Sequence, residues 1–371
     1  MLHHTTLADI AKELGVSVPT VHRALTGQGR VNEKTRQAVL EVAKKMNYVH
    51  HADADTPAMR IAFVCPDNFF YRHIISGVDT AVKTHAQDGL SIQYFLEDDY
   101  NTQSQIEYLR QILQSDLFHG VILSPTHAML LNPLIQGLSD KGIPTVTVNN
   151  DVPQSSRICF VGEDSYMSGQ MAAELYTYIL PGDASIAVMQ SMVSAEGLKK
   201  RVDGFCDGVQ ASGKCNLIGK IDFYDNIQNA TETAKLAILN TKIDGIFVNS
   251  MIGTIGILRA MNEYAADAPP FLIGYDMNEE IKQGIQSGVI FGTLLQSPYW
   301  QGYYAVQALY QTLKSGKAPV NSTLFTPTQL ILRSNLSQLK SNRILELGNW
   351  QRSDMDTEIL SSDNSSDNSD N

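Results

Sequence analysis

Residues 6–25 read TLADIAKELGVSVPTVHRAL and contain the patterns of two short helices. Apolar side chains recur at helical spacing over 7–14, and Gly15 follows them, a residue that readily adopts the left-handed conformation at a helix end. Ser17 is suited to cap a second helix, with Pro19 in its first turn, where a missing N–H costs nothing. Two short helices joined by a turn that contains glycine predict a helix-turn-helix.

A third helix and the local charge complete a small basic head over residues 1–49. Asn32 is suited to cap this helix, and apolar side chains between Val39 and Met46 would form its buried stripe. The first 50 residues hold seven Lys and Arg against four Asp and Glu, whereas the other 321 hold 21 basic and 35 acidic side chains. This asymmetry, in a chain of net charge −11, is expected when only one end of a protein contacts phosphate.

The head resembles the DNA-binding domain of the lactose-repressor (LacI/GalR) family. The resemblance rests on residues 6–25, on VNEKTR at 31–36 and on MNY at 46–48. It implies that the second helix enters the major groove of operator DNA, where Arg23 makes a bidentate contact with guanine. It assigns the DNA contacts to Thr6, Ser17, Val18, Pro19, Thr20, His22, Arg23, Arg30, Thr35 and Tyr48. A plain three-helix bundle used for protein contacts is the alternative interpretation.

Residues 50–59 have no apolar periodicity and are predicted to be a linker. Relatives in the family continue here with a hinge helix whose leucine inserts into the minor groove. This chain has neither leucine nor arginine in the segment, and Asp53 and Asp55 would lie where phosphate is close. We therefore expect an extended linker and operator DNA that is bent little.

From Arg60 the sequence changes to short apolar strands that alternate with amphipathic helices. This alternation predicts parallel sheets with helices on both faces, and about 280 residues of it exceed one ordinary sheet, so two lobes are expected. Predicted strands are Ile61–Cys65, Ile92–Leu96, Gly120–Leu123, Thr145–Val148, Ile186–Met189, Gly245–Val248, Phe271–Tyr275 and Gly292–Leu295. Predicted helices include Ile74–Ala86, Gln103–Gln114, Met167–Ile179, Leu198–Ala211, Ala230–Leu239 and Thr254–Tyr264.

The body, residues 60–340, resembles the periplasmic-binding-protein-like ligand domain of the same family, which is similar to ribose-binding and related sugar receptors. The resemblance rests on PDNFF at 66–70, VGED at 161–164, KRVDGF at 200–205 and IGYD at 273–276. These motifs follow strands or begin helices, where open α/β sheets bind ligands. The resemblance assigns the effector contacts to Asp67, Phe69, Phe70, Asn149, Arg201, Ser250, Asp276 and Gln296.

Several of these residues have a purely structural alternative. Phe69 and Phe70 would either face the C–H groups of a sugar ring or pack in the core. Arg201 would donate to ligand oxygens or form a surface salt bridge, and Asp276 would accept ligand hydroxyls or cap a helix near Glu279.

Two further features bear on the shape of the site. Sugar receptors often have Asn or Asp where this chain has Ser250, and the shorter side chain leaves room that argues against a simple pentose. Tyr299 and Trp300 follow Gln296 on a predicted helix, where they would pack in the core or a dimer face, or line the cleft.

The two resemblances together imply an all-α helix-turn-helix head followed by a two-lobed α/β domain of the type I periplasmic-binding-protein-like class, with parallel sheets. The function they imply is that of a DNA-binding transcriptional regulator, a repressor, whose operator affinity is controlled by a sugar or sugar-like polyol. The expected partners are double-stranded operator DNA, the small effector and a second copy of the chain in a homodimer.

Other classes of protein are less consistent with the sequence. The main alternative is a sugar-modifying enzyme in which Asp67, Glu163 and Asp276 supply a glycosidase-like pair, but the chain has no G-x-S-x-G, no H-E-x-x-H and no phosphate loop. Nine scattered His and four Cys without a C-x-x-C pair predict neither a metal site nor a disulfide, and no cofactor is expected. No secretory signal or membrane span is apparent, which predicts a cytoplasmic protein with no membrane partner rather than a secreted receptor. The acidic tail, 353–371, is predicted to be disordered.

Overall fold

The computed structural model describes residues 7–26, 31–45, 59–98, 100–191, 195–224, 226–265 and 268–337. Nearly all of the predicted linker, 50–59, and the whole acidic tail, 353–371, lie outside these residues, so the expectations for both stay predictions. Within the described ranges, none of the helices combines the length and the apolar character that crossing a membrane requires.

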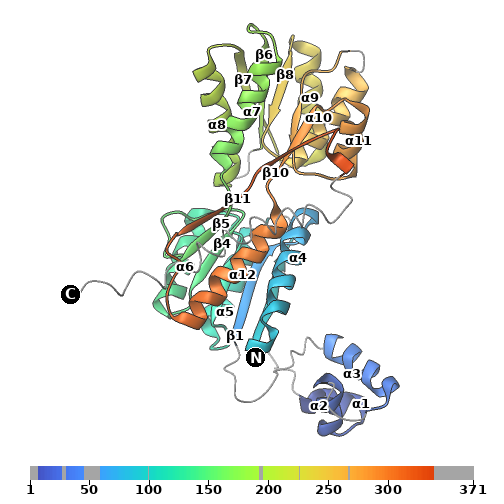
Figure 1. Ribbon diagram of the computed structural model, residues 1–371, viewed down its shortest axis with the longest axis vertical. Helices are drawn as coiled ribbons and strands as arrows, with labels where there is room; N and C mark the ends of the chain where they lie inside the picture. The colour runs from blue at the N-terminus through green and yellow to red at the C-terminus, as the bar shows by residue number, and fades with distance from the viewer. Residues whose placement is uncertain are drawn as a thin grey trace, which may run out of the picture. The chain divides into compact units, whose positions relative to one another are not determined.

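The head consists of three helices, α1 (Leu7–Leu14), α2 (Val18–Thr26) and α3 (Glu33–Lys45), drawn in blue in Figure 1. Gly15 has a φ of 64°, and the Ser17 Oγ accepts a hydrogen bond from the Thr20 N–H at 3.3 Å. The core of the head is formed by Ile10, Ala11, Val21, Ala24, Val39 and Ala43. The predicted helix-turn-helix is confirmed, because α1 and α2 are joined by the glycine turn and share one apolar core.

The body contains two lobes, of which the lower one in Figure 1 is built on a six-stranded sheet of order β11-β5-β4-β3-β1-β2. Its strands are β1 (Met59–Pro66), β2 (Leu90–Glu97), β3 (Gly120–Leu123), β4 (Thr145–Val148), β5 (Cys159–Glu163) and β11 (Thr323–Thr326). The pairings β1–β3, β3–β4, β4–β5 and β5–β11 are all parallel. Its helices are α4 (Phe69–Thr84), α5 (Thr102–Gln114), α6 (Ala128–Asp140) and α12 (Pro298–Ser315). Helix α12 packs on β3, β4 and β5, and α5 and α6 close a separate apolar cluster with β1 and β3.

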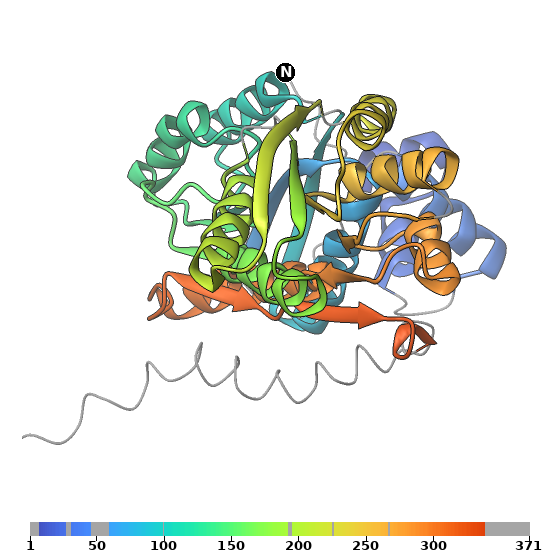
Figure 2. The same cartoon turned by 90° about the horizontal axis from the view of Figure 1, so that it is seen from above.

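The upper lobe combines two three-stranded sheets that are joined by a bridge between Gly245 and Phe271. Its strands are β6 (Ser185–Ser191), β7 (Asn216–Phe223), β8 (Gly245–Val248), β9 (Ile273–Tyr275), β10 (Gly292–Leu295) and β12 (Gln329–Leu332). Its helices are α7 (Ser165–Ile179), α8 (Glu196–Ser212), α9 (Ile227–Asn240), α10 (Met251–Tyr264) and α11 (Glu279–Ser287). Seen from above in Figure 2, the green helices α7 and α8 lie on one side of the strands and the yellow and orange α9, α10 and α11 on the other, each group with its own apolar cluster. The predicted two-lobed α/β body is therefore confirmed.

Helices α7 and α8 approach each other closely at two glycines. A Cβ atom at Gly204 would lie 2.0 Å from the Tyr166 carbonyl oxygen, and one at Gly169 would lie 2.1 Å from the carbonyl oxygen of Arg201. Such separations are well inside van der Waals contact, so only glycine allows the two backbones to meet there. This contact sets where the N-terminal half of α8, which carries Arg201, lies in the upper lobe.

The chain passes between the lobes three times, after β5, after β10 and after β11. Side chains of the third crossing bind the other two. The Thr326 hydroxyl donates to the Gln296 carbonyl oxygen at 3.0 Å, and the Thr328 hydroxyl donates to the Glu163 carboxylate at 2.9 Å. The Ser297 hydroxyl donates in turn to the Pro327 carbonyl oxygen at 2.8 Å. The three crossings thus form one hydrogen-bonded strap between the lobes.

Candidate functional site

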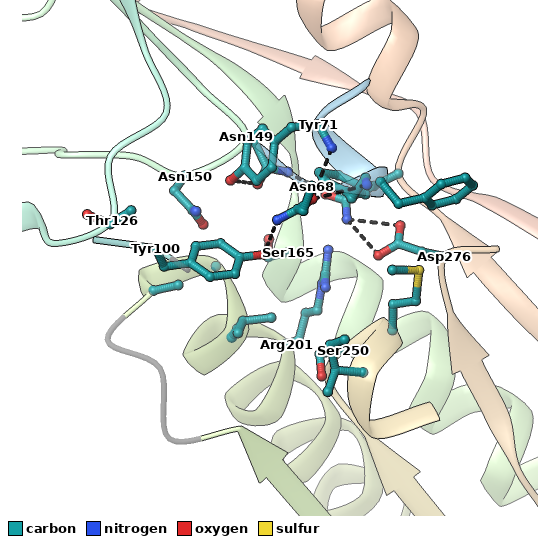
Figure 3. A pocket seen from close by; sticks show the side chains of 18 of the residues that line it. Asn68, Tyr71, Tyr100, Thr126, Asn149, Asn150, Ser165, Arg201, Ser250 and Asp276 are labelled. Carbon is teal, nitrogen blue, oxygen red and sulfur yellow. Dashed lines mark hydrogen bonds between the residues drawn. The ribbon is translucent and has the colours of Figure 1, made fainter. Parts of the chain in front are cut away.

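A cavity of about 680 Å³ lies between the two lobes of the body (Figure 3). Its lining residues follow the carboxyl ends of strands in both lobes, as expected for a ligand site in an open α/β fold. All eight residues predicted to contact the effector line it, namely Asp67, Phe69, Phe70, Asn149, Arg201, Ser250, Asp276 and Gln296. The structure therefore brings the predicted set together, while their contacts with an effector stay a prediction.

Twelve further lining residues were not predicted from the sequence. They are Asn68, Tyr71, Tyr100, Thr126, Asn150, Ser165, Ala195, Gly197, Leu198, Asn226, Met251 and Ile252. Most are polar or small residues immediately after a strand, and a short polar residue in a loop has no periodic pattern that would mark it out beforehand.

The lower wall of the cavity begins with Asn68, at the start of α4. The Asn68 Oδ1 accepts hydrogen bonds from the backbone N–H groups of Phe70 and Tyr71, and its Nδ2 donates to the Tyr100 hydroxyl at 3.2 Å. Phe69 is 54% exposed and Phe70 is half-buried, so the alternative that they are core residues is wrong. Their rings are available as apolar faces on this wall.

A chain of polar side chains crosses the cavity from the lower to the upper lobe. The Tyr71 hydroxyl donates to the Asn149 Oδ1 at 3.2 Å, and the Asn149 Nδ2 donates to the Gln296 Oε1 at 2.9 Å. The Gln296 Nε2 then donates to both carboxylate oxygens of Asp276, at 3.0 and 3.2 Å. An ionised carboxylate has about four lone-pair sites, so Asp276 retains acceptor capacity toward the cavity.

Arg201 extends from α8 into the cavity (Figure 3). Its Nε and Nη2 donate to one Glu163 carboxylate oxygen at 2.9 and 2.7 Å, its Nη1 donates to the Asn249 carbonyl oxygen at 3.0 Å, and its guanidinium carbon lies 4.4 Å from the Tyr275 ring centre. Arg201 is 4% exposed, so it is a buried ion-pair partner and not the surface salt bridge that the sequence left open. Three of the five guanidinium N–H groups are used in these bonds, which leaves two for a ligand.

Asp276 lies buried after β9, and burial raises the pKa of its carboxyl group from 3.8 to about 6. The positive charge of Arg201 and the hydrogen bond from Gln296 act in the opposite direction, while the negative charge of Glu163 adds to the rise. Asp276 does not cap the following helix, because the side chain of Asn278 accepts from the Ile281 N–H at 2.8 Å and caps α11.

Backbone strain gathers at the cavity. Of the residues that the structure describes, the non-glycine ones with positive φ are Tyr100 (56°), Asn149 (66°), Asp276 (59°) and Ser297 (55°). Three of them line the cavity and the fourth follows the lining residue Gln296. Such conformations cost about 1–3 kcal/mol each, persist only where the surrounding structure holds them in place, and are frequent at binding and active sites.

Two other residues have plain structural roles. Ser250 caps α10, because its Oγ accepts from the Gly253 N–H at 3.2 Å, and this task suits a short hydroxyl side chain. Trp300 is 8% exposed and packs against Tyr303 and Tyr304, outside the cavity lining. The structure thus places Trp300 in the core.

The head presents part of the predicted DNA-contacting set on α2. Val21 and Ala24 face its core, whereas Val18 is 41% exposed and Arg23 is exposed. The Ser17 and Thr20 hydroxyl oxygens lie 2.8 Å apart at the start of the helix, and Thr35 on α3 is half-buried. The predicted contacts Thr6, Arg30 and Tyr48 lie outside the described residues, as do the side chains of Pro19 and His22.

The cavity offers hydrogen-bond donors and acceptors beside aromatic rings, which is the chemistry that binds a polyhydroxylated ring. Among the residues with assigned positions, no group of three or more His, Cys, Asp or Glu is arranged to hold a metal ion. The described parts of the body therefore contain a site suited to recognition of hydroxyl groups.

Comparison with known proteins agrees with this architecture. Residues 61–318 match the family model of a periplasmic binding protein domain, and residues 6–50 match that of the bacterial regulatory proteins of the lacI family. The ribose operon repressor of Halalkalibacterium halodurans is 27% identical over 345 residues, 89% of this chain and 96% of that protein. The transcriptional regulator DegA of Bacillus subtilis is 28% identical over 219 residues, 56% of this chain and 62% of that protein, which is less than two thirds of its length.

A solved structure shows the same fold in the body. The solute-binding protein of an ABC transporter from Burkholderia graminis C4D1M, in complex with D-arabinose, superposes with a TM-score of 0.70 at 19% identity. The match covers 76% of this chain and 98% of that one. Over most of its length the chain belongs to the periplasmic-binding-protein domain family, and its helix-turn-helix head makes it a DNA-binding regulatory protein of the lacI family.

Proposed function

We propose that this regulator is a repressor that binds operator DNA through α2 and α3 of the head and releases or retains it according to a sugar or sugar-like polyol in the cavity of the body. The observation that carries the proposal is the polar chain from Tyr71 through Asn149 and Gln296 to Asp276, which lies beside Arg201 and the exposed ring of Phe69. Paired donors and acceptors next to an apolar ring face suit the hydroxyl and C–H surfaces of a sugar.

The named relatives support the same class of effector. One is a ribose operon repressor that aligns with 89% of this chain, and one solved relative holds D-arabinose. An effector held by residues of both lobes would favour their closure, and closure would change the separation of the two chain segments that lead to the heads in a dimer. We propose this change of geometry as the signal to DNA.

We also propose that the chain is a cytoplasmic homodimer. Family operators are near-palindromes that two symmetric heads read together, whereas one chain carries one recognition helix. Sedimentation at micromolar protein with operator present is expected to give a dimer, and a monomer under these conditions would refute this part of the proposal.

Binding without turnover is proposed for the cavity. The glycosidase alternative needs two carboxyl groups that act on one glycosidic bond, and the Glu163 carboxylate is engaged by Arg201 and by the Thr328 hydroxyl, so it is not free to act as the partner of Asp276. Incubation with aryl glycosides is expected to release no phenol. Release of a phenol by the wild type that is lost in the Asp276→Asn variant would favour the enzyme.

The central test combines footprinting with ligand titration. Purified protein is footprinted on the promoter region of its own gene, and the footprint is repeated with D-ribose, D-galactose, D-arabinose and myo-inositol. We expect one sugar or polyol both to change the footprint and to raise the thermal unfolding temperature of the body, because a ligand that binds only the folded state stabilises it by mass action. A footprint that no sugar or polyol alters would argue against the proposal.

A further inference from the structure

We infer that the cavity selects an uncharged polyol and rejects the phosphorylated or carboxylated form of the same sugar. This inference rests on the proposed function and narrows the class of its effector. It follows from the balance of charges around the cavity and from the ion pair that Arg201, the one arginine in the described lining, forms with Glu163.

The positive charge of Arg201 is already matched by a partner. Glu163 binds the guanidinium through Nε and Nη2, and the side chains of the two residues are 5% and 1% exposed. A buried pair of this kind has little net charge toward a third group. The two remaining N–H groups of Arg201 can therefore donate to hydroxyl or ring oxygens, but the site offers an anion no uncompensated cation there.

Asp276 adds a negative charge close to the same guanidinium. The residue is 8% exposed and lines the cavity, and its carboxylate accepts hydrogen bonds from the neutral amide of Gln296. With a pKa of about 6 this carboxyl group is mostly ionised above neutral pH. A ligand phosphate or carboxylate would meet this charge in a poorly solvated place, where like charges repel far more than they do in water.

Asp67 contributes the same sign of charge at the other wall. Its nearest cation is Arg72, whose side chain is 73% exposed and lies 3.9 Å away, so solvent screens this pair. The described part of the lining thus holds the carboxylates of Asp67 and Asp276 against one guanidinium that Glu163 neutralises.

The helix N-termini at the cavity do not reverse this balance. Helices α4, α7, α8, α9 and α10 begin there, and free N–H groups at a helix start would attract an anion. Ala195 gives the start of α8 no side-chain cap, but Glu196 places a negative charge in its first turn. The other four starts have a side-chain acceptor, which for α9 is Asn226. Asn68 caps α4, Ser250 caps α10, and the carboxylate of Asp164 accepts from the Met167 N–H at 3.0 Å and so caps α7 with a negative charge.

The test uses matched pairs of ligands that differ in charge. Isothermal titration at pH 7.5 compares D-ribose with D-ribose 5-phosphate, D-galactose with D-galacturonate and D-glucose with D-glucose 6-phosphate, with myo-inositol as a ring without an anomeric carbon. We expect at least one neutral ligand to bind. The affinity for its anionic counterpart should be lower by a factor of about ten or more. The full-length protein is used throughout.

Two variants test the cause of the selection. Asp276→Asn removes the repelling charge with little change of shape, and Glu163→Gln removes the partner that neutralises Arg201. Each is expected to raise the affinity for the anion relative to its neutral partner by about threefold or more, whereas Asp116→Asn, at a fully exposed carboxylate, leaves the ratio unchanged. Operator binding by each variant shows that it is folded.

The outcomes separate this inference from the proposed function. An anionic sugar that binds as well as or better than its neutral partner would overturn the inference and leave the sugar-responsive repressor standing. Ratios that stay unchanged in both folded variants would overturn the electrostatic cause. Failure of all seven ligands to bind would remove the proposed function, and the inference with it.

Discussion

Asp276→Asn is expected to stabilise the body in a pH-dependent manner. In the folded protein the carboxyl group keeps its proton up to a pKa of about 6, whereas in the unfolded chain it ionises near its ordinary value of 3.8. Between these two pH values the folded state binds more protons than the unfolded state, so the free energy of unfolding falls as the pH rises. Above pH 6 this loss is complete and amounts to about 3 kcal/mol, at about 1.4 kcal/mol for each unit of pKa.

An asparagine at this position has no charge to bury and keeps an oxygen that accepts from the Gln296 amide. The variant should therefore resemble the wild type in stability at pH 4 and exceed it by up to about 3 kcal/mol at pH 7.5. Urea unfolding followed by tyrosine and tryptophan fluorescence, at several pH values between 4 and 7.5, measures the difference. Only the difference between the two proteins is interpreted, because the other carboxyl groups titrate equally in both.

Asp116→Asn serves as the control, since it removes a carboxylate that is fully exposed and not buried. A difference for Asp276→Asn that is constant across the pH range, or a variant less stable than the wild type at pH 7.5, would refute the reasoning. The same substitution should weaken effector binding, because a carboxylate acceptor is stronger than an amide oxygen. A residue that destabilises the empty protein and is needed for the ligand is typical of a binding site.

Three further outcomes are expected. Arg23→Ala should remove the discrimination between operator and random DNA in gel shifts, because the loss of one bidentate base contact costs about 1–3 kcal/mol of binding free energy. Effector titrations should stay unchanged. A variant that discriminates as well as the wild type would contradict this prediction. Arg201→Ala should abolish the effector response and leave DNA binding without effector unchanged, because Glu163 loses its ion-pair partner and the ligand loses two hydrogen-bond donors. An unaltered calorimetric titration would exclude Arg201 from the site. Gly204→Ala should lower the unfolding midpoint of the body strongly, whereas Gly182→Ala, with open space around it, should not; equal midpoints would mean that α7 and α8 can separate at no cost.

Four short strands that are buried over nearly their whole length could be predicted from the sequence. Strands Gly120–Leu123, Thr145–Val148, Gly245–Val248 and Gly292–Leu295 have the bounds that the sequence predicts, because each is a short run rich in apolar and β-branched side chains in the middle of a sheet. Strand β7 was missed, since almost all of NLIGKIDF is exposed at the sheet edge and the run contains a glycine.

Other elements lacked a local signal. Helix α6 contains Pro133, which argues against a helix when the sequence alone is considered. Strands β11 and β12 are four residues each, and their pairing partners lie far away in the chain, β5 for one and β10 for the other. These two segments become strands only because the fold brings them beside β5 and β10.

The site was predictable through the family motifs, which marked eight lining residues between positions 67 and 296. The state of those residues was not predictable. That Arg201 is bound by Glu163 and that Gln296 joins Asn149 to Asp276 depend on which strand ends lie side by side. These hydrogen bonds join residues 20 to 147 positions apart, and such contacts leave no periodicity in a single sequence. That Asn278 and not Asp276 caps α11 depends on the residue at which the helix begins.

The left-handed backbone at Asn149 and Asp276 also limits how this protein can diverge. Only glycine, asparagine and aspartate adopt that conformation readily, so most exchanges at these two positions would strain the main chain before any change in ligand preference could be selected. Glycine would relax the backbone and delete the side chain that lines the cavity. Descendants that respond to a different effector should therefore keep both positions and vary the rim at Phe69, Met251 and Ile252, whose backbone has no such constraint. Asn149 and Asp276 thus form a constant part of the cavity, and a change of effector is expected to arise through substitutions of the side chains around them.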